Sequence, residues 1–444
     1  MDVIGAGLAG AEAAWQLAQR GHRVRLREMR PGRMTPAHQT DRAAEMVCSN
    51  SFKSDDPNSA TGILKAELKR MDSLILGCAE ATRVPAGNSL AVDRFAFADR
   101  VSAELRGHPG IQWVEEEVTR VEPGVPTLMA TGPLTAEPLA DWLAEACGSQ
   151  RLFFYDAIAP IVERDSIDTR VAFLAARYDK GDPDFFNCPM DQAGYEAFVT
   201  ALLAAPRAVL HDFDTPFFEA CLPIEVMADR GRETLRHGPM KPVGLDDPRT
   251  GRYPYAVVQL RQDNLAGDHF NMVGFQTRLT WGAQQEVFRL IPGLERAEFV
   301  RLGSIHRNTY VKAPQVLDAS LAVRQVPGLW IAGQLSGVEG YLESAASGLA
   351  AALSMDRAGA GLEPAPLPRE TMLGALLHYL AHASIKDFCP TNAMLGLLPP
   401  IAEGVLDHRA IKRAGGLRAL KAAKGALHRD RALAALAGFL GTRP

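Results

Sequence analysis

The sequence predicts an α/β fold, and two segments far apart in the chain carry that prediction. At the start, an apolar strand over 1–4 leads through a glycine-rich turn into an alanine-rich helix that ends near Gln19, and a second strand follows over 23–27. Much later, the apolar segment 329–332 ends at another glycine, Gly333. We interpret both as parts of one Rossmann-like domain, in which buried parallel strands alternate with helices.

Composition and charge narrow the class of protein. The chain has 444 residues, of which 47% are hydrophobic and 23% charged, as in globular proteins of two or three domains. Its net charge of -4 requires any nucleic-acid binding to use local basic patches. The six cysteines form no CxxC pair, which disfavours a metal site and indicates reduced thiols. The chain opens on a strand rather than a leader and has no apolar run that could cross a bilayer, so we expect a cytoplasmic protein without a membrane segment.

The segments between the early strands, over 1–27, and the late strand, over 329–332, predict an inserted domain. Up to residue 152 we expect a polar loop over 31–57, helices over 62–76 and 94–105, a strand pair over 111–121 and a strand over 128–130. From 153 to 322, Phe, Tyr, Asp and Pro replace the alanine-rich helices, which predicts an α+β insertion. The Rossmann-like domain then resumes over 323–444, with a helix over 340–353, a Pro/Gly-rich linker over 361–368 and a basic, helical C-terminal segment.

The glycine turn predicts a dinucleotide site. Gly5, Gly7 and Gly10 follow a strand and open a helix, and the acidic residue Glu28 follows about twenty residues later. Gly5 permits the tight turn, Gly7 lets the backbone approach a pyrophosphate, and Gly10 lets the helix pack closely on the sheet. The N-terminus of the helix favours phosphate, and Glu28 would accept hydrogen bonds from ribose hydroxyls. The alternative is a glycine turn that binds no ligand.

A later segment favours FAD over NAD as that dinucleotide. The stretch Val326 to Gly333 resembles the late strand of two-dinucleotide-fold flavoproteins. In those proteins the next residue, usually Asp, contacts the flavin side of FAD; here it is Gln334. The helix that begins near Gly340 would point its N-terminus at the flavin and stabilise negative charge on it. A third contact is implied at Thr131-Gly132, which resembles another flavoprotein motif.

Longer motifs are spread along the chain. They are Val47-Cys48-Ser49-Asn50-Ser51, Thr82 to Gly87, Asn187-Cys188-Pro189-Met190, Cys221 to Ala228, Arg230 to Thr234, Gly238 to Pro242, and Val338 to Ala345. With these motifs the chain closely resembles the folate- and FAD-dependent tRNA (uracil-5-)-methyltransferases, TrmFO, over nearly its whole length. This family is related to the larger flavoproteins that modify the wobble uridine of tRNA and that carry a long extra C-terminal region.

The resemblance implies a reaction and its partners. NAD(P)H reduces FAD, methylenetetrahydrofolate supplies a one-carbon unit, and a T-loop uridine of tRNA (position 54) receives it at C5. The partners are therefore tRNA and folate, and no protein partner is evident. The resemblance, rather than composition or spacing, supplies the folate chemistry.

The reaction needs a thiol, because uracil C5 becomes nucleophilic only after a thiolate adds to C6. A base then removes the C5 proton and the thiol leaves. By resemblance, Cys221 and Cys48 are the functional cysteines. We expect Cys221, close in sequence to Arg230 and Arg232, to attack uracil, and Cys48, beside Lys53, to support proton transfer or carbon handling. The two cysteines could exchange these roles.

Other residues are candidates for binding the substrates. Arg230, Arg232 and Lys241 follow Cys221 and would lie near the target base, which must leave its stack to react. His306 and Arg307 offer faces that can stack on a planar ring or bind folate carboxylates, or they form a loop hydrogen-bond network. We expect Tyr341 and Glu343, which follow the flavin-facing turn, either to position flavin or folate or to cap the helix.

Basic residues between 408 and 431 either contact phosphate or form a solvated helix face. Three other functions stay open at this point. The first is flavin-dependent modification of another tRNA uridine, the second is RNA chaperoning without chemistry, and the third is oxidation or reduction of a small molecule.

Overall fold

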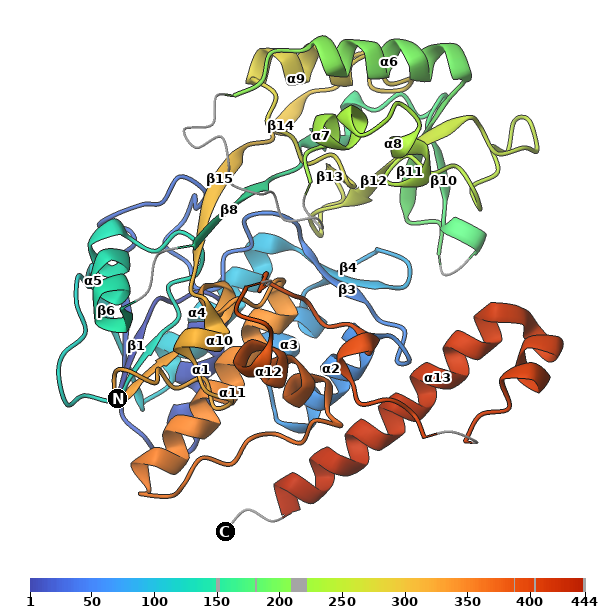
Figure 1. Cartoon of the computed structure of the whole chain (residues 1–444). Helices are drawn as coiled ribbons and strands as arrows, with labels where there is room; N and C mark the ends of the chain where they lie inside the picture. Colours follow the sequence, from blue (N-terminus) through green and yellow to red (C-terminus); the bar gives the residue numbers. More distant parts are fainter. Residues whose placement is uncertain (149–151, 180–181, 209–221, 387, 403–404, 442–444) are drawn as a thin grey trace.

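The computed structural model describes residues 1–148, 152–179, 182–208, 222–386, 388–402 and 405–441 (Figure 1). Its first sheet is parallel throughout and has five strands, in the order β16-β7-β1-β2-β6. The strands are β16 (Leu329–Ile331), β7 (Thr127–Met129), β1 (Asp2–Ile4), β2 (Val24–Glu28) and β6 (Ile111–Glu115). The start of the chain and the segment 329–331 therefore belong to one sheet, which confirms the predicted Rossmann-like α/β fold.

Two helices from opposite ends of the chain pack against each other beside this sheet. They are α1 (Leu8–Gln19) and α11 (Tyr341–Gly359). Gly348 permits their close approach, because a Cβ at this position would lie only 2.1 Å from the carbonyl oxygen of Ala9. The alanine-rich sequence of α1 serves the same purpose, since small side chains let two helix backbones approach.

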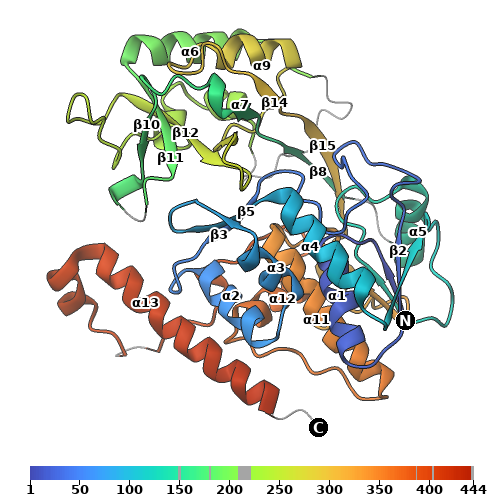
Figure 2. The ribbon, with the colours of Figure 1, turned by 180° about the vertical axis from the view of Figure 1, so that it is seen from behind.

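The remaining elements of this part surround the sheet. A small antiparallel sheet has the order β3-β5-β4, from β3 (Ser51–Ser54), β5 (Ser89–Val92) and β4 (Arg83–Val84). Figure 2 shows it on the side that faces the second large sheet. The helices are α2 (Ala60–Arg70), α3 (Leu74–Ala81), α4 (Arg94–Gly107), α5 (Glu137–Cys147), α10 (Ala313–Val316) and α12 (Met372–His382).

Three predicted elements differ from the structure. The predicted helix over 62–76 is two helices, α2 and α3, because Asp72 has a φ of +52° and the Ser73 side chain caps α3 by accepting from the Leu76 N–H. The predicted strand pair over 111–121 contains one strand, β6. The loop predicted over 31–57 contains β3, which pairs with β5.

A second sheet has six antiparallel strands in the order β10-β11-β12-β13-β9-β14. They are β10 (Phe173–Ala175), β11 (Phe185–Met190), β12 (Ala256–Gln262), β13 (His269–Met272), β9 (Ile161–Glu163) and β14 (Phe299–Arg301). Helices α6 (Gln192–Ala204) and α9 (Trp281–Phe288) lie together at the top in Figure 1. The shorter helices α7 (Ile224–Asp229) and α8 (Thr234–His237) lie beside this sheet.

This second sheet has a hydrophobic core of its own, which includes Tyr195, Phe198, Phe275 and Phe288. Strands β8 (Leu152–Ala157) and β15 (Ile305–Tyr310) pair antiparallel and join the two large sheets (Figure 1). The domain boundaries at 152 and 322 stay a prediction.

The turn between β12 and β13 docks on the first part of the molecule. The Arg94 guanidinium pairs with Asp263 at 2.8 Å, and the Asn50 amide donates to the Gln262 carbonyl at 3.0 Å. The Leu265 N–H donates to the Asp93 carboxylate at 2.8 Å. These contacts bring the second sheet against the loop that carries Cys48.

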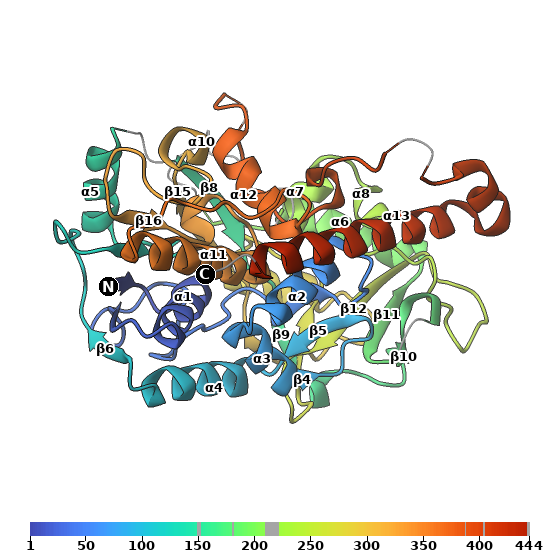
Figure 3. The same cartoon turned by 90° about the horizontal axis from the view of Figure 1, so that it is seen from below.

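The C-terminal helix α13 (His408–Gly441) packs along α2 (Figure 3). A Cβ at Gly425 would lie 2.1 Å from the Asn58 carbonyl oxygen, so glycine permits this contact. Gly416, with a φ of +67°, interrupts the regular helix. Within the described ranges, none of the helices combines the length and apolar character that a membrane crossing requires.

Candidate active site

The glycine turn joins β1 to α1. Gly5 has a φ of +95°, and a Cβ there would lie 2.7 Å from the carbonyl oxygen of Ala130. A Cβ at Gly10 would lie 1.8 Å from the carbonyl oxygen of Gly5. At Gly7 the nearest atom would be 3.9 Å away. Gly5 and Gly10 are therefore required by close packing, whereas Gly7 leaves the N-terminus of α1 open on one side.

Glu28 ends β2 beside this turn. Its carboxylate accepts the Ala6 N–H at 2.8 Å and the Arg30 Nε–H at 2.9 Å. Burial opposes ionisation, yet the Arg30 guanidinium and these N–H groups hold the pKa of Glu28 below its ordinary value. Glu28 is thus an ionised acceptor, fixed in place at the end of its strand.

Residues from β7 and β16 form the opposite wall. Thr131 and Gly132 follow β7, and Gly333 and Gln334 follow β16. Gly333 has a φ of +73°, and its N–H donates to the Ser347 hydroxyl of α11 at 2.8 Å. These contacts fix the late glycine against the helix that begins at 341.

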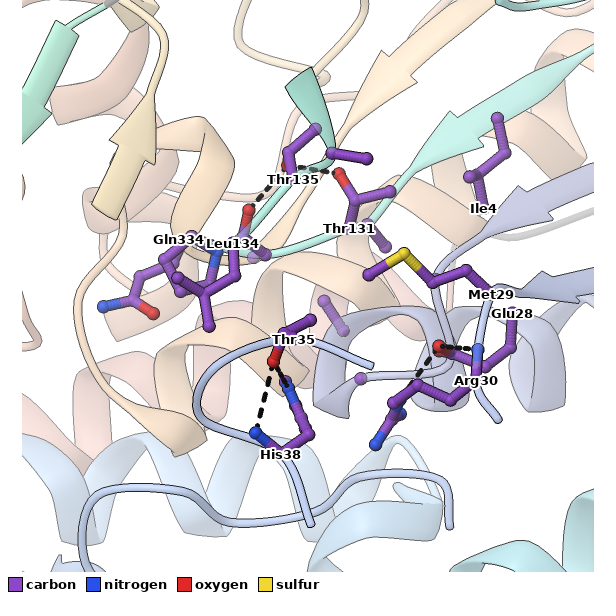
Figure 4. A pocket seen from close by; sticks show the side chains of 18 of the residues that line it. Ile4, Glu28, Met29, Arg30, Thr35, His38, Thr131, Leu134, Thr135 and Gln334 are labelled. Atoms are coloured by element: carbon purple, nitrogen blue, oxygen red, sulfur yellow. Dashed lines mark hydrogen bonds and ion pairs between the residues drawn. The ribbon is translucent and has the colours of Figure 1, made fainter. Parts of the chain in front are cut away.

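Together these segments line a cavity of about 140 Å³, which we call the turn cavity (Figure 4). Its lining includes most of the predicted cofactor-binding residues: Gly5, Gly7, Glu28, Thr131, Gly132, Gly333, Gln334 and Tyr341. Gly10 packs behind the turn instead. The sequence did not identify Arg30, Thr35 and His38, which come from the loop after β2; the Thr35 hydroxyl and His38 Nδ1 lie 2.6 Å apart.

A second cavity of about 410 Å³ adjoins the first, and we call it the thiol cavity because Cys48 lines it. The backbone N–H of Cys48 donates to the Tyr341 hydroxyl at 2.7 Å, and its Sγ lies 3.8 Å from the Ala157 carbonyl oxygen. Burial and the nearby Cys48 thiol raise the pKa of Tyr341, so the phenol stays protonated. The two cavities share Val47, Pro133, Leu134, Gln334, Tyr341 and Ser344.

Gly340 belongs to the thiol cavity rather than the turn cavity. Its φ is +116°, and a Cβ there would lie 2.2 Å from Glu343 Oε2. Glu343 is fully buried, and its other oxygen, Oε1, pairs with Lys53 Nζ at 3.0 Å. The entrance to α11 is therefore crowded, and only glycine fits.

Buried arginines lie beside Cys48. Arg261 Nη2 donates to Asn50 Oδ1 at 2.9 Å, and Arg94 donates to the Met46 carbonyl oxygen at 3.1 Å. Burial lowers the pKa of Arg261 to about 10, so its guanidinium is still charged at neutral pH. The Cys48 thiol is among the groups that act on Arg261 electrostatically. The loop of Cys48 is thus held by two positively charged side chains, Arg261 of β12 and Arg94 of α4.

Comparison with known proteins gives consistent matches. The model of the family described as glucose inhibited division protein A matches residues 1–363. A methylenetetrahydrofolate–tRNA-(uracil-5-)-methyltransferase TrmFO from Anoxybacillus flavithermus is 51% identical over 422 residues, covering 95% of this chain and 98% of the relative. The protein of the same name from Desulforudis audaxviator is 52% identical over 439 residues, covering 99% and 97%.

The chain belongs to the TrmFO family. Among solved structures, two crystal forms of Aquifex aeolicus GidA align with TM-scores of 0.66 and 0.67 at 16% and 17% identity. They cover 86% of this chain and 67% and 69% of GidA. At that identity the likeness establishes the fold alone, and it agrees with the α/β architecture described above.

The other expected catalytic cysteine of this TrmFO-family chain, Cys221, lies outside the described residues. Its predicted neighbours lie on the surface beside α7 and α8: Arg230 directly follows α7, Lys241 is exposed, and Arg232 donates to the Thr200 hydroxyl at 2.5 Å. None of these three cations is part of the described lining of either cavity. Their roles as binders of the substrate stay predictions.

His306 and Arg307 lie in β15, where their backbones pair with Asp156 and Tyr155 of β8. Their side chains are outside the described part of the structure. The next residue, Asn308, is buried and lines the thiol cavity. The segment that we expect to bind folate therefore runs past this cavity, and the roles of its two basic residues stay predictions.

Two of the basic residues of α13 already bind the chain itself. Arg429 Nη1 donates to Asn58 Oδ1 at 3.0 Å, and Arg431 Nη1 donates to the Pro400 carbonyl oxygen at 3.0 Å. These contacts fasten α13 to its surroundings. Lys421 and Arg413 are exposed, and contact with phosphate at these residues stays a prediction.

Proposed function

We propose that this chain methylates C5 of a T-loop uridine in tRNA, with methylenetetrahydrofolate as the carbon donor and FAD reduced by NAD(P)H. The observation that carries the proposal is the identity of 51–52% to TrmFO proteins over nearly the full length of both chains. A tRNA-modifying enzyme of this kind acts in the cytoplasm, where we place the chain.

The residues of the turn cavity fit FAD. The open N-terminus of α1 at Gly7 suits the pyrophosphate, and the ionised Glu28 suits the ribose hydroxyls. The flavin end then belongs where the two cavities share Gln334 and Tyr341. When bound and reduced, FAD supplies the electrons that convert the donated carbon into a methyl group.

The chain's own groups perform the addition to uracil. The thiolate of Cys221 forms a bond to C6, and the electron pair of the C5–C6 double bond moves toward C5 and O4. After C5 has gained the new carbon, a base removes the C5 proton, and the C6–S bond breaks with return of the thiolate. Cys48 supports the transfer beside the flavin end, where it lines the thiol cavity.

The substrates approach from the second sheet. Arg230, Arg232 and Lys241 contact the tRNA phosphates near the target base, and His306 and Arg307 bind folate. Opening of the base from its stack brings the uracil into the thiol cavity. This arrangement accounts for two adjoining cavities, of which one is suited to a dinucleotide and the other carries a thiol.

Single substitutions of the two cysteines test these roles. Cys221→Ala and Cys48→Ala should both keep bound FAD and its reduction by NAD(P)H while losing transfer of the methyl group to tRNA. Cys78→Ala is the control, because Cys78 is buried in the core away from both cavities. A Cys221→Ala protein that methylates normally would refute the role of Cys221. If only Cys48→Ala abolishes a covalent complex with 5-fluorouridine-containing tRNA, Cys48 is the attacking thiol.

A further inference from the structure

Arg261 and Asn271 lie directly opposite each other in neighbouring strands. The register of β12 and β13 pairs their Cα atoms, so both side chains project from the same face of the sheet. Both line the thiol cavity, as does Cys48. The exposed fractions are 9% for Arg261 and 3% for Asn271, so both polar groups are held inside the protein.

The amide of Asn271 is incompletely satisfied. Among the described residues, its Nδ2 has no hydrogen-bond partner although the atom is buried. Native proteins rarely leave a buried donor unpaired, because the loss of its hydrogen bond to water is not compensated. An unpaired donor on a residue that lines a cavity is suited to a ligand that brings an acceptor.

Within the part of the chain that the structure describes, the cation of Arg261 forms no ion pair with a carboxylate. Its hydrogen bonds within the described residues run from Nε and Nη2 to Asn50 Oδ1, a neutral acceptor, at 3.2 and 2.9 Å. The carboxylate that acts on it electrostatically, Asp263, is paired with Arg94 at 2.8 Å. A buried guanidinium without its own carboxylate favours a ligand that carries, or develops, negative charge.

We propose that Arg261 and Asn271 form a subsite for the lactam edge of uracil, the C4 carbonyl and the N3–H beside it. This inference rests on the proposed function and identifies the groups that hold its base. Asn271 Nδ2 donates to O4, and its Oδ1 accepts from N3–H, which is the two-point pairing that an amide makes with a lactam. Arg261 donates to the same O4.

The pair also assists the reaction. When the thiolate adds to C6, negative charge develops on O4, and a hydrogen bond from a buried cation is stronger to that enolate than to the neutral carbonyl. Arg261 therefore stabilises the adduct more than the bound base. Asn50, which accepts two of its N–H groups, is the positioning residue that directs the guanidinium.

The chemistry of Asn271 supplies a specificity test. Cytosine reverses the edge of uracil, because its N4 is a donor and its N3 an acceptor. Asn271→Asp removes the donor to uracil O4 and supplies an acceptor for cytosine N4, and the O–H of its protonated form donates to cytosine N3. The base specificity is the kcat/KM for tRNA with the target uridine divided by the kcat/KM for the same tRNA with cytidine at that position. We expect this ratio to fall at least about 100-fold in the variant. The control Asn264→Asp makes the same charge change in the β12–β13 turn, outside the described cavity lining, and should keep the wild-type ratio.

A second pair of measurements identifies the ligand, because the pterin ring of folate carries the same lactam edge. For Asn271→Ala we expect kcat/KM for tRNA to fall about 10- to 100-fold with unchanged affinity for methylenetetrahydrofolate. For Arg261→Gln we expect a loss in kcat larger than the rise in KM. Loss of folate affinity with normal use of tRNA would overturn the assignment to uracil, and so would an Asn271→Asp protein with the wild-type base ratio. Absence of methylation by the wild type would instead refute the proposed function itself.

Discussion

The surroundings of Glu67 predict how much the stability of the protein changes with pH. This residue of α2 is fully buried and accepts the backbone N–H groups of Met372 and Leu373 at 2.6 and 3.0 Å, at the start of α12. Burial raises the pKa of Glu67 from 4.5 to about 7, although the two N–H groups lower it. The protonated carboxyl is thus the form that the folded protein prefers at mildly acidic pH.

The sign of the effect follows from the two pKa values. In the unfolded chain Glu67 ionises near 4.5, whereas in the folded protein it keeps its proton until about 7. The stabilising contribution is therefore complete below about pH 4.5 and is lost as the pH rises through about 7. At about 1.4 kcal/mol for each pH unit, the free energy of unfolding falls by about 3 kcal/mol across this window.

Glu67→Gln should remove this dependence on pH. The amide oxygen can accept one N–H of α12, but its NH₂ group faces the second donor, which costs about 1–2 kcal/mol at every pH. We expect the variant to be less stable than the wild type near pH 5 and equal to it or more stable near pH 8, in urea unfolding at a series of pH values. Glu80→Gln, at a partly exposed carboxylate of α3, is the control and should keep the wild-type profile. Parallel profiles for the wild type and Glu67→Gln would refute the reasoning.

Three further outcomes are expected. Gly10→Ala should yield protein without bound FAD, because the new Cβ would lie 1.8 Å from the Gly5 carbonyl oxygen. The control Gly77→Ala should keep its flavin absorbance, because a Cβ at that position would have no atom within 4 Å. A Gly10→Ala protein that keeps its yellow flavin colour would contradict the packing argument. Burial raises the pKa of Cys188 to about 12, so iodoacetamide near pH 8 should label it only after denaturation, and labelling of the native protein would show that this thiol is accessible. The affinity for tRNA should fall with salt, and Lys241→Gln should reduce the slope of the log–log plot by about one; an unchanged slope would exclude a phosphate contact at Lys241.

Local sequence predicted the turn cavity because the relevant signals are close together. The glycine spacing, the following helix and the acidic end of β2 lie within the first 28 residues, and the structure places them around one cavity. The late strand could be paired with them because its composition and its terminal glycine indicate a buried strand. In contrast, the break between α2 and α3 was missed, since the leucines continue the helical pattern across Asp72 and Ser73. The Asp-Ser pair was the available signal, because serine caps helices.

Local sequence could not predict which residues form the wall of the thiol cavity. Asn50 and Arg261 are 211 residues apart in sequence, and they meet because the β12–β13 turn docks on the loop of Cys48. An arginine in a strand is usually a surface residue, and only tertiary contacts reveal that Arg261 is buried. The same holds for Asn271, whose importance depends on an unsatisfied donor rather than on any motif.

The most direct test of the proposed function is transfer of a labelled carbon. Purified protein is incubated with unmodified tRNA, NAD(P)H and methylenetetrahydrofolate labelled in its one-carbon unit, and the tRNA is digested to nucleosides. We predict label in 5-methyluridine, which disappears when the T-loop uridine is replaced. Label in a different nucleoside would show that the enzyme modifies another position of tRNA. Oxidation of NAD(P)H by the FAD-bound protein without any label in tRNA would contradict the methyltransferase assignment and favour a small-molecule oxidoreductase.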